Sequence, residues 1–479
     1  MSNNAAVRTS KNALMLLFGT ITRMVGSFAF VLYSASLLGV EGFGKLSITI
    51  HFFELFLSLV ATAAGILLTR DSARWRRNRN GLFTSSIILV VLLCAAAPFA
   101  IIPLAFGMGY SKDTIQAIGI SCLALLPASI SVLYEAEFVA HERAEFVTAG
   151  IAVESLVRIF LSILVLKLGF GLIELSWVLV LSRTALTVYY FMSLRTITDH
   201  AWKFSWRQTR RFMLRWRVFA AENWMATIYT NLDVLVLSWI SGEAAVGLYS
   251  AAWKFVRLGA VFAKSFTTAV FPVMSRMYKD SKDSFNQLFR HTVRIMCIIA
   301  LPAIVGVSVF TDRIVGVMYT DEYKDAGPIL RVLIWVLLLE FLNPFLSHVL
   351  FSKGKQKQSM YVAAVGLCVN SAAAFLLVRQ FGAMGAAVGC ILGGLVATFC
   401  YLFFASKIDE LPGLIIEIIR VSLAACGMGC VLYLLGEAPW PVIGLAAAFS
   451  YVVLLFVVRA IRVNDLRFVG RIFLRKATA

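Results

Sequence analysis

Long apolar runs separated by short polar connections cover most of the chain. Each run is about 20 to 25 residues long, and an α-helix needs ~20 residues to cross the ~30 Å hydrocarbon layer of a bilayer. The runs lie at 13–38, 46–69, 82–106, 115–139, 147–167, 172–194, 218–240, 248–271, 292–311, 328–351, 359–379, 384–405, 414–435 and 441–460. This pattern predicts an all-α polytopic membrane protein with about 14 transmembrane helices.

Composition excludes the main soluble classes of protein. Of the 479 residues, 60% are hydrophobic and only 15% are charged, whereas a soluble domain has about 25% charged residues. A soluble enzyme, a secreted disulfide scaffold and a disordered chain are therefore excluded. The eight cysteines fall inside apolar runs without a CxxC pair or a metal-type spacing to histidine, so we expect buried thiols and no metal site. The first run is too long for a signal-peptide core, so we expect it to remain as a span.

The basic residues predict the orientation of the chain. Connections on one side of the membrane hold 29 Lys and Arg, and those on the other side hold six. Because cytoplasmic loops carry the excess of Lys and Arg, both termini are expected in the cytoplasm. The same bias explains the net charge of +18 without nucleic acid as a partner. The longest outer connection, 312–327, has 16 residues, which leaves no room for the outer domain of a glycan polymerase.

The connection at 195–217 divides the chain into comparable halves. It interleaves aromatic residues with arginines, which predicts a basic amphipathic segment in the cytoplasmic interface. Each half contains six spans, as in transporters built from parallel repeats. The predicted organisation is an N-terminal lobe 1–194, a linker 195–217, a C-terminal lobe 218–406, and two further helices with a basic tail at 407–479.

Faint sequence echoes support this repeat. Residues after the first span match residues after the seventh span with one residue inserted: Glu41, Gly44 and Ser47 with Glu243, Gly247 and Ser250. A second set matches without a gap: Tyr110, Gly169, Phe191 and Ser193 with Tyr323, Gly382, Phe404 and Ser406. We therefore expect two pseudo-symmetric six-helix lobes followed by two extra helices.

Charges inside the spans are candidates for function, because each costs at least ~2.5–3.5 kcal/mol on insertion scales. Polar residues form a stripe on the second span (Ser47, His51, Glu54, Ser58), gather on the seventh (Glu222, Asn223, Thr227, Thr230, Asn231, Asp233), and share a face of the eighth (Lys254, Arg257, Lys264). The first span carries Arg23. Such stripes must face protein or water rather than lipid, so the first two helices of each half are predicted to share a polar cavity.

Positive charge predominates in this predicted cavity, which favours an anionic substrate over a lipophilic cation. The predicted substrate-binding residues are Arg23, Lys254, Arg257, Lys264, Arg183 and Arg158. Three carboxylates, Glu54, Asp233 and Glu340, are candidates either for binding a coupling ion or for internal salt bridges. Glu154 and Arg158 lie one turn apart on the fifth span and are expected to neutralise each other, and Arg183 is a further candidate partner of Glu154 across helices.

Several motifs resemble Wzx-type polysaccharide flippases of the multidrug/oligosaccharidyl-lipid/polysaccharide exporter superfamily. The resembling stretches are Asn12 through Arg23, Leu38-Gly39-Val40-Glu41-Gly42-Phe43-Gly44, Gly65-Ile66 with Arg70, and Tyr319-Thr320-Asp321-Glu322-Tyr323 followed by Ala326 and Leu330. The glycine-rich turn that usually ends the second span departs from the family pattern here, as Ala64-Gly65-Ile66.

The resemblance implies a non-enzymatic transporter of the bacterial inner membrane. It implies that undecaprenyl-pyrophosphate-linked oligosaccharide moves from the cytoplasmic to the periplasmic leaflet, with Arg23, Lys254 and Arg257 on the pyrophosphate or acidic sugars. It also implies a groove for the lipid tail at the last two spans and a polymerase as a partner. Because the predicted cavity lies inside one chain, oligomerisation is unnecessary and we expect a monomer. No GxxxxGK[ST] loop is present, which excludes direct ATP hydrolysis. We expect no cofactor, and the driver is expected to be a proton or sodium gradient or the membrane potential.

Three alternatives stay open. A lipid II flippase and an ion-coupled multidrug or metabolite antiporter belong to the same superfamily. A glycan-polymerising enzyme is the alternative from a different class, and the short outer connections argue against it.

Overall fold

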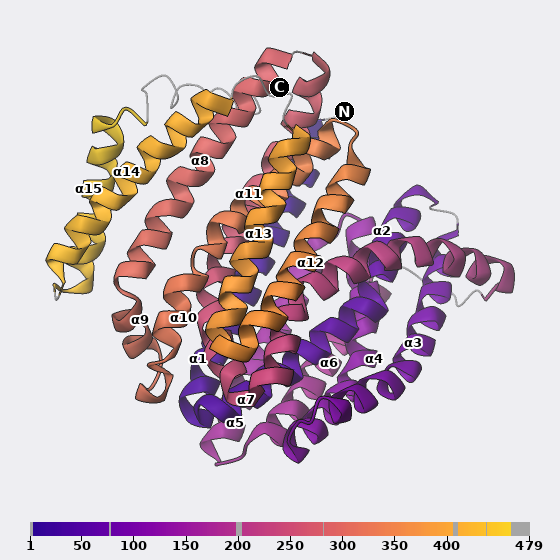
Figure 1. The fold of residues 1–479 in the computed structure, drawn as a ribbon. Helices are drawn as coiled ribbons and strands as arrows, with labels where there is room; N and C mark the ends of the chain where they lie inside the picture. The colour runs from indigo at the N-terminus through magenta and orange to yellow at the C-terminus, as the bar shows by residue number, and fades with distance from the viewer. Residues whose placement is uncertain are drawn as a thin grey trace. The chain divides into compact units, whose positions relative to one another are not determined.

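The computed structural model describes residues 3–75, 78–197, 204–280, 282–405, 411–436 and 438–460, and nearly all of them are helical (Figure 1). The elements are α1 (Asn3–Leu57), the π-helix η1 (Ser58–Thr62), α2 (Ala63–Arg74), α3 (Arg79–Gly107), α4 (Lys112–Ala140), α5 (Ala144–Lys167), α6 (Leu172–Arg195), α7 (Trp206–Asp280), α8 (Lys282–Val309), α9 (Thr311–Met318), the 3-10 helix η3 (Asp321–Tyr323), α10 (Ala326–Leu333), α11 (Val336–Ser352), α12 (Gln356–Phe381), α13 (Ala383–Ala405), α14 (Leu411–Leu435) and α15 (Trp440–Val457). The predicted all-α membrane architecture is confirmed.

Twelve helical stretches in the described residues are long and apolar enough to cross a membrane. Two of them contain a break at a glycine with positive φ, Gly39 (φ 67°) in α1 and Gly242 (φ 81°) in α7. Glycine adopts this conformation without the steric cost that a Cβ would add. The breaks separate the first predicted span from the second, and the seventh from the eighth, so fourteen apolar segments are present.

Two connections differ from the predicted layout. Residues 206–217 of the predicted linker form the first turns of α7 and continue directly into the seventh span. The tenth predicted span is divided between α10 and α11. In both places the apolar pattern located the membrane segment, but it did not show where the backbone continues or breaks.

The two broken helices contact each other through reciprocal glycines. A Cβ added to Gly44 would lie 1.8 Å from the carbonyl oxygen of Glu243, and one added to Gly247 would lie 2.2 Å from that of Val40. The same offset of 203 residues relates Gly39 to Gly242 and Gly44 to Gly247. The predicted match of Gly44 and Ser47 with Gly247 and Ser250 has this offset. The inserted residue was wrong, because the two breaks align without it and Glu243 corresponds to Val40.

The second set of echoes also falls on a shared backbone feature. Gly169 follows α5 with φ 81°, and Gly382 follows α12 with φ 54°. Both positions end a helix in a conformation that favours glycine. The described residues therefore support a duplicated ancestor at the turns as well as in the span pattern.

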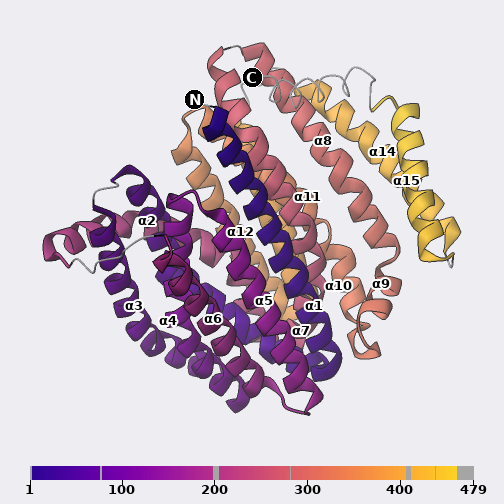
Figure 2. The ribbon, with the colours of Figure 1, turned by 180° about the vertical axis from the view of Figure 1, so that it is seen from behind.

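The chain divides into two compact units, Met1–Ser250 with Met318–Glu322, and Ala251–Val317 with Tyr323–Ala479. In the first unit α4 packs against α1, α2, α3 and α6, and α1 runs beside α5 (Figure 2). In the second unit α12 packs along α13, α11 contacts α8 and α13, and α14 packs between α8 and α15. The predicted lobe boundaries stay a prediction.

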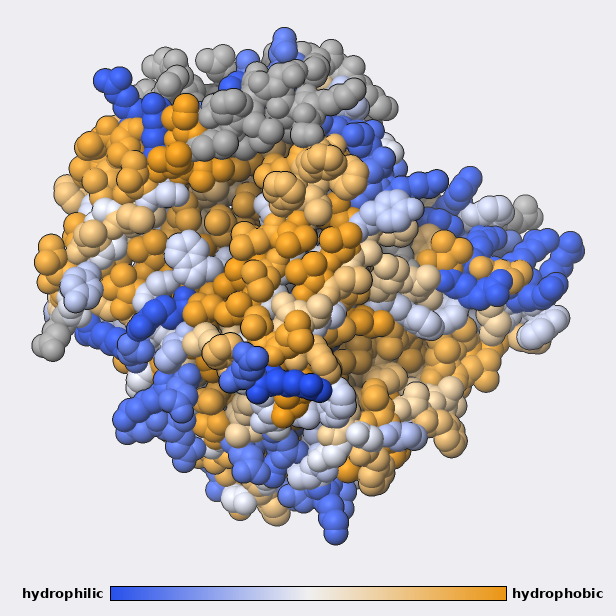
Figure 3. Space-filling view, viewed as in Figure 1, coloured by the Kyte–Doolittle hydropathy of each residue, from blue (hydrophilic) through white to orange (hydrophobic). Residues whose placement is uncertain are grey.

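Large apolar side chains remain exposed on the helices. Phe99 is 83% exposed and Phe399 is 72% exposed, and apolar side chains cover much of the face in Figure 3. An exposed apolar surface of this extent suits contact with lipid rather than water.

Candidate functional site

Ionisable side chains of α1, α4 and α6 meet inside the first unit. The guanidinium of Arg23 lies 3.4 Å from Oε1 of Glu135. The hydroxyl of Tyr190 donates a hydrogen bond of 3.1 Å to the same oxygen. The side chain of Arg23 is nevertheless 50% exposed, so this ion pair leaves part of the guanidinium accessible within an apolar helix.

A second charged group on α5 and α6 lies in the same unit. Arg183 pairs with Glu154 at 3.2 Å, and its guanidinium lies 5.4 Å from the ring centroid of Phe53. Arg158 lies 4.6 Å from the ring centroid of Phe30. Glu154 thus forms its ion pair with Arg183 across helices rather than, as expected, with Arg158 on its own helix. Glu154 is buried, with 6% of its side chain exposed, and Arg183 is part-buried, with 16% exposed.

The Glu154–Arg183 pair yields a stability prediction. Glu154→Ala leaves the Arg183 guanidinium without its carboxylate, and breaking a buried pair in this way costs about 3–5 kcal/mol. Glu154→Leu with Arg183→Met removes both charges, and we expect it to recover most of the loss. The measurement is the thermal unfolding of the purified protein. A double variant as unstable as Glu154→Ala would show that the loss does not come from an unpaired Arg183 guanidinium.

The predicted polar stripes of the second and seventh spans contact each other. Ser58 hydrogen-bonds the hydroxyl of Thr227 at 2.7 Å, and the amide of Asn223 donates to the carbonyl and hydroxyl oxygens of Ser58. These contacts occur at η1, where a π-turn interrupts the helix. Such turns are frequent at functional sites. The prediction that these stripes face protein is therefore confirmed at Ser58.

The carboxylates of the first unit differ in environment. Asp233 is buried and accepts a hydrogen bond from the hydroxyl of Tyr249. Glu54 is exposed on α1. On a membrane-spanning helix an exposed carboxylate must meet water or another part of the protein, so Glu54 and Arg23 both indicate a polar path along α1.

The remaining predicted site residues belong to the second unit. Lys254 and Arg257 lie part-buried on α7, Lys264 is exposed on the same helix, and Glu340 lies on α11. Arg257 is close enough to Glu340 to interact with it electrostatically. A cavity shared by the charged residues of both halves stays a prediction.

Three residues on α4 and α6 make polar contacts that the sequence did not predict. Glu135 and Glu137 lie near the end of the fourth predicted span, where a charge is inexpensive, and Tyr190 resembles an interfacial tyrosine. In the structure Glu137 is fully buried and accepts a hydrogen bond of 2.7 Å from Ser72. The one signal for these contacts in the sequence was that two carboxylates, Glu135 and Glu137, lie only two residues apart.

The arrangement in the first unit suits the binding of anions. A guanidinium presents a planar fork of donors that matches phosphate or carboxylate oxygens. The half-exposed side chain of Arg23 pairs with Glu135, and Tyr190 donates a hydrogen bond to that same carboxylate. An anionic group that enters from water can therefore compete for donors that are already oriented.

The sequence of this chain matches a family model and several curated relatives. A family model described as a polysaccharide biosynthesis protein matches residues 34–328. The probable low-salt glycan biosynthesis flippase Agl15 of Haloferax volcanii is 21% identical over 262 residues, which cover 54% of this chain and 51% of that protein. The capsular polysaccharide biosynthesis protein CapF of Staphylococcus aureus is 24% identical over 185 residues, 38% of this chain and 47% of that protein.

The fold extends beyond these sequence matches. The solved structure of the lipid II flippase MurJ in an inward closed conformation superposes with a TM-score of 0.74 at 15% identity, and covers 98% of this chain and 100% of that one. The chain spans about half the length of the curated relatives it matches. The shared fold is that of a polytopic helical membrane protein.

Proposed function

Because the chain belongs to the polysaccharide biosynthesis protein family, we propose that it flips a lipid-linked oligosaccharide across the membrane. The substrate is an undecaprenyl-pyrophosphate-linked oligosaccharide, which moves from the cytoplasmic to the periplasmic leaflet of a bacterial inner membrane for export of surface polysaccharide. The observation that carries the proposal is the half-exposed side chain of Arg23 on an apolar helix. Such a group needs a polar environment in the membrane and suits an anionic headgroup.

The mechanism follows from the polarity of the substrate. The pyrophosphate and sugars cannot cross hydrocarbon unaided, because each buried polar group without a partner costs several kcal/mol. A polar cavity that opens alternately to the two leaflets lets the headgroup pass while the polyprenyl chain stays in lipid. In this proposal the lobes 1–194 and 218–406 surround the cavity, and α14 and α15 border the path of the lipid tail.

The charged residues have separate roles in the proposal. Arg23, Lys254, Arg257 and Lys264 bind the pyrophosphate or acidic sugars. Arg158 and Arg183 add positive potential, while the Glu154–Arg183 pair holds α5 against α6. Glu54, which is exposed, is the carboxylate best placed to exchange a coupling proton or sodium ion with water. Asp233 and Glu340 act as pairing carboxylates beside Tyr249 and Arg257.

Reconstitution tests this function. The full chain is placed in vesicles that carry labelled undecaprenyl-pyrophosphate oligosaccharide, and a membrane-impermeant glycosidase measures how much of the glycan becomes accessible. We expect protein-dependent transfer that responds to an imposed proton or sodium gradient. Transfer of a lipophilic cation without transfer of the glycan lipid would show an antiporter instead, and transfer of lipid II alone would show a lipid II flippase.

A further inference from the structure

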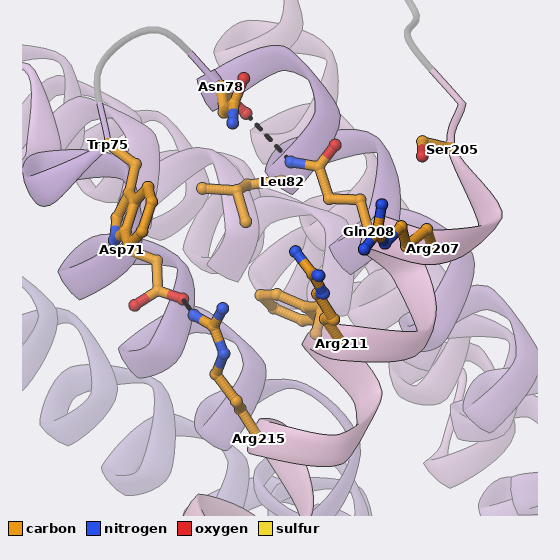
Figure 4. A pocket seen from close by; sticks show the side chains of 10 residues that line it. Asp71, Trp75, Asn78, Leu82, Ser205, Arg207, Gln208, Arg211 and Arg215 are labelled. Atoms are coloured by element: carbon orange, nitrogen blue, oxygen red, sulfur yellow. Dashed lines mark hydrogen bonds and ion pairs between the residues drawn. The ribbon is translucent and has the colours of Figure 1, made fainter.

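The first turns of α7 form a pocket with the end of α2 and the start of α3. Its volume is about 220 Å³, and its lining includes Asp71, Trp75, Arg207, Arg211 and Arg215 (Figure 4). This lies at the face that the distribution of Lys and Arg assigns to the cytoplasm. All of these residues belong to the first unit.

This part of α7 is held against the bundle by buried contacts. Phe212 is 2% exposed, and the hydroxyls of Thr209 and Ser85 are hydrogen-bonded at 3.1 Å. Gln208 packs against Gly81, where a Cβ would lie 2.2 Å from its Oε1, and its amide donates to the carbonyl oxygen of Asn78. The pocket therefore has fixed walls.

The charges in the pocket do not balance. Arg207, Arg211 and Arg215 recur every four residues, so they share one face of the helix. Asp71 accepts from Arg215 at 2.8 Å and from Arg70 at 3.1 Å. Within the part of the chain that the structure describes, neither Arg207 nor Arg211 pairs with a carboxylate. Figure 4 shows the Arg211 side chain extending toward the centre of the pocket.

The residues around the pocket indicate which kind of anion neutralises its excess positive charge. Trp75 is 50% exposed beside the pocket, and Phe204 and Trp206 are each 65% exposed at the start of the helix. Exposed aromatic side chains next to arginines are typical of a segment at the level of lipid headgroups. Anionic lipids in the cytoplasmic leaflet attract such segments.

From these observations we infer that the pocket binds the phosphodiester headgroup of an anionic glycerophospholipid. Arg207 and Arg211 donate to the phosphate oxygens, and Asn78 and Gln208 supply neutral polar groups at the rim. The volume is below the ~300–1,000 Å³ of a site that encloses a whole drug-sized ligand, so the acyl chains stay in the bilayer. The bound lipid holds the start of α7 at the membrane surface. This inference does not depend on the transported substrate.

Native mass spectrometry of the full chain tests the site, with phosphatidylglycerol or zwitterionic phosphatidylcholine added to the detergent-purified protein. We expect wild-type protein to retain phosphatidylglycerol preferentially. Arg207→Gln with Arg211→Gln is expected to lower this retention by at least about tenfold, because two charge-assisted hydrogen bonds are lost and one alone is worth about tenfold. Arg210→Gln with Arg217→Gln removes the same charge from exposed positions outside the pocket lining, and we expect a change of about twofold at most.

Three outcomes would overturn the inference. Unchanged retention in the pocket variant would show that no headgroup binds there. Equal losses in both double variants would show only diffuse surface electrostatics. Binding of inorganic phosphate alone, with displacement of phosphatidylglycerol at millimolar phosphate, would identify a site for a soluble anion. Thermal unfolding is measured for each variant, and if the pocket double variant does not fold, Arg211→Gln alone is compared with Arg210→Gln.

Discussion

Replacing Arg23 or Arg257 by alanine is expected to abolish glycan export while the protein still reaches the membrane. Each substitution removes a guanidinium from an apolar helix, and the anionic headgroup then loses charge-assisted hydrogen bonds worth about 1.5–3 kcal/mol each. Arg23 is half-exposed, so its loss affects the substrate more than the packing. The measurement is surface polysaccharide in a complemented deletion strain, with the protein quantified in the membrane fraction.

Arg331→Ala is the control for this experiment. Arg331 is as exposed as Arg23 and also pairs with a carboxylate, Asp312 at 2.8 Å, but it lies at the end of its apolar segment that faces the outer connection. An exposed pair of this kind contributes about 0–1 kcal/mol, so export is expected to stay close to the wild-type level. Normal export by both Arg23→Ala and Arg257→Ala at wild-type protein levels would refute the assignment of the binding residues.

Gly44→Ala is expected to destabilise the first unit, because the backbones of the two broken helices approach each other closely at this glycine. The added Cβ would lie 1.8 Å from the carbonyl oxygen of Glu243, and the obstacle is backbone that cannot rotate away. Overpacking of a well-packed site costs about 1–3 kcal/mol, occasionally more. Gly247→Ala makes the reciprocal clash with Val40, and the two substitutions together should prevent recovery of folded protein. Thermal unfolding of the purified variants measures the effect.

Gly119→Ala provides the matched control inside α4. No heavy atom lies within 4 Å of the added Cβ, and alanine is favoured over glycine in a helix by about 0.5–1 kcal/mol. The unfolding temperature is therefore expected to stay the same or to rise. If Gly44→Ala behaved like Gly119→Ala, the close approach of the two broken helices would not be a feature of the folded protein.

The membrane architecture was predictable because hydrocarbon imposes a strong constraint on sequence. Every backbone donor and acceptor in the bilayer must be satisfied within a helix, so each span appears as an apolar run of suitable length. The contact of Ser58 with the seventh span was predictable for a related reason, because a polar side chain that recurs on one helix face must avoid lipid. The matched glycines Gly44 and Gly247 also indicated the repeat.

Pairing across helices could not be predicted in the same way. Glu135 and Tyr190 meet Arg23 because of how α1, α4 and α6 are rotated about their axes, and that rotation depends on packing rather than on periodicity. The choice of Arg183 over Arg158 by Glu154 has the same origin. The sequences around Gly39 and Gly242 also suit a continuous helix, so they did not reveal the breaks. The π-turn that begins at Ser58 has no characteristic amino-acid composition by which it could be recognised.

The most direct test of the flippase proposal is the location of lipid-linked oligosaccharide in a deletion strain. The measurement probes which leaflet of the inner membrane displays the glycan headgroup, in a background without a redundant flippase. We expect accumulation on the cytoplasmic side together with loss of surface polysaccharide, and recovery of both with the wild-type chain. Unchanged lipid-linked glycan with intact surface polysaccharide would contradict it, and the cationic residues of the spans would then serve a different anionic cargo.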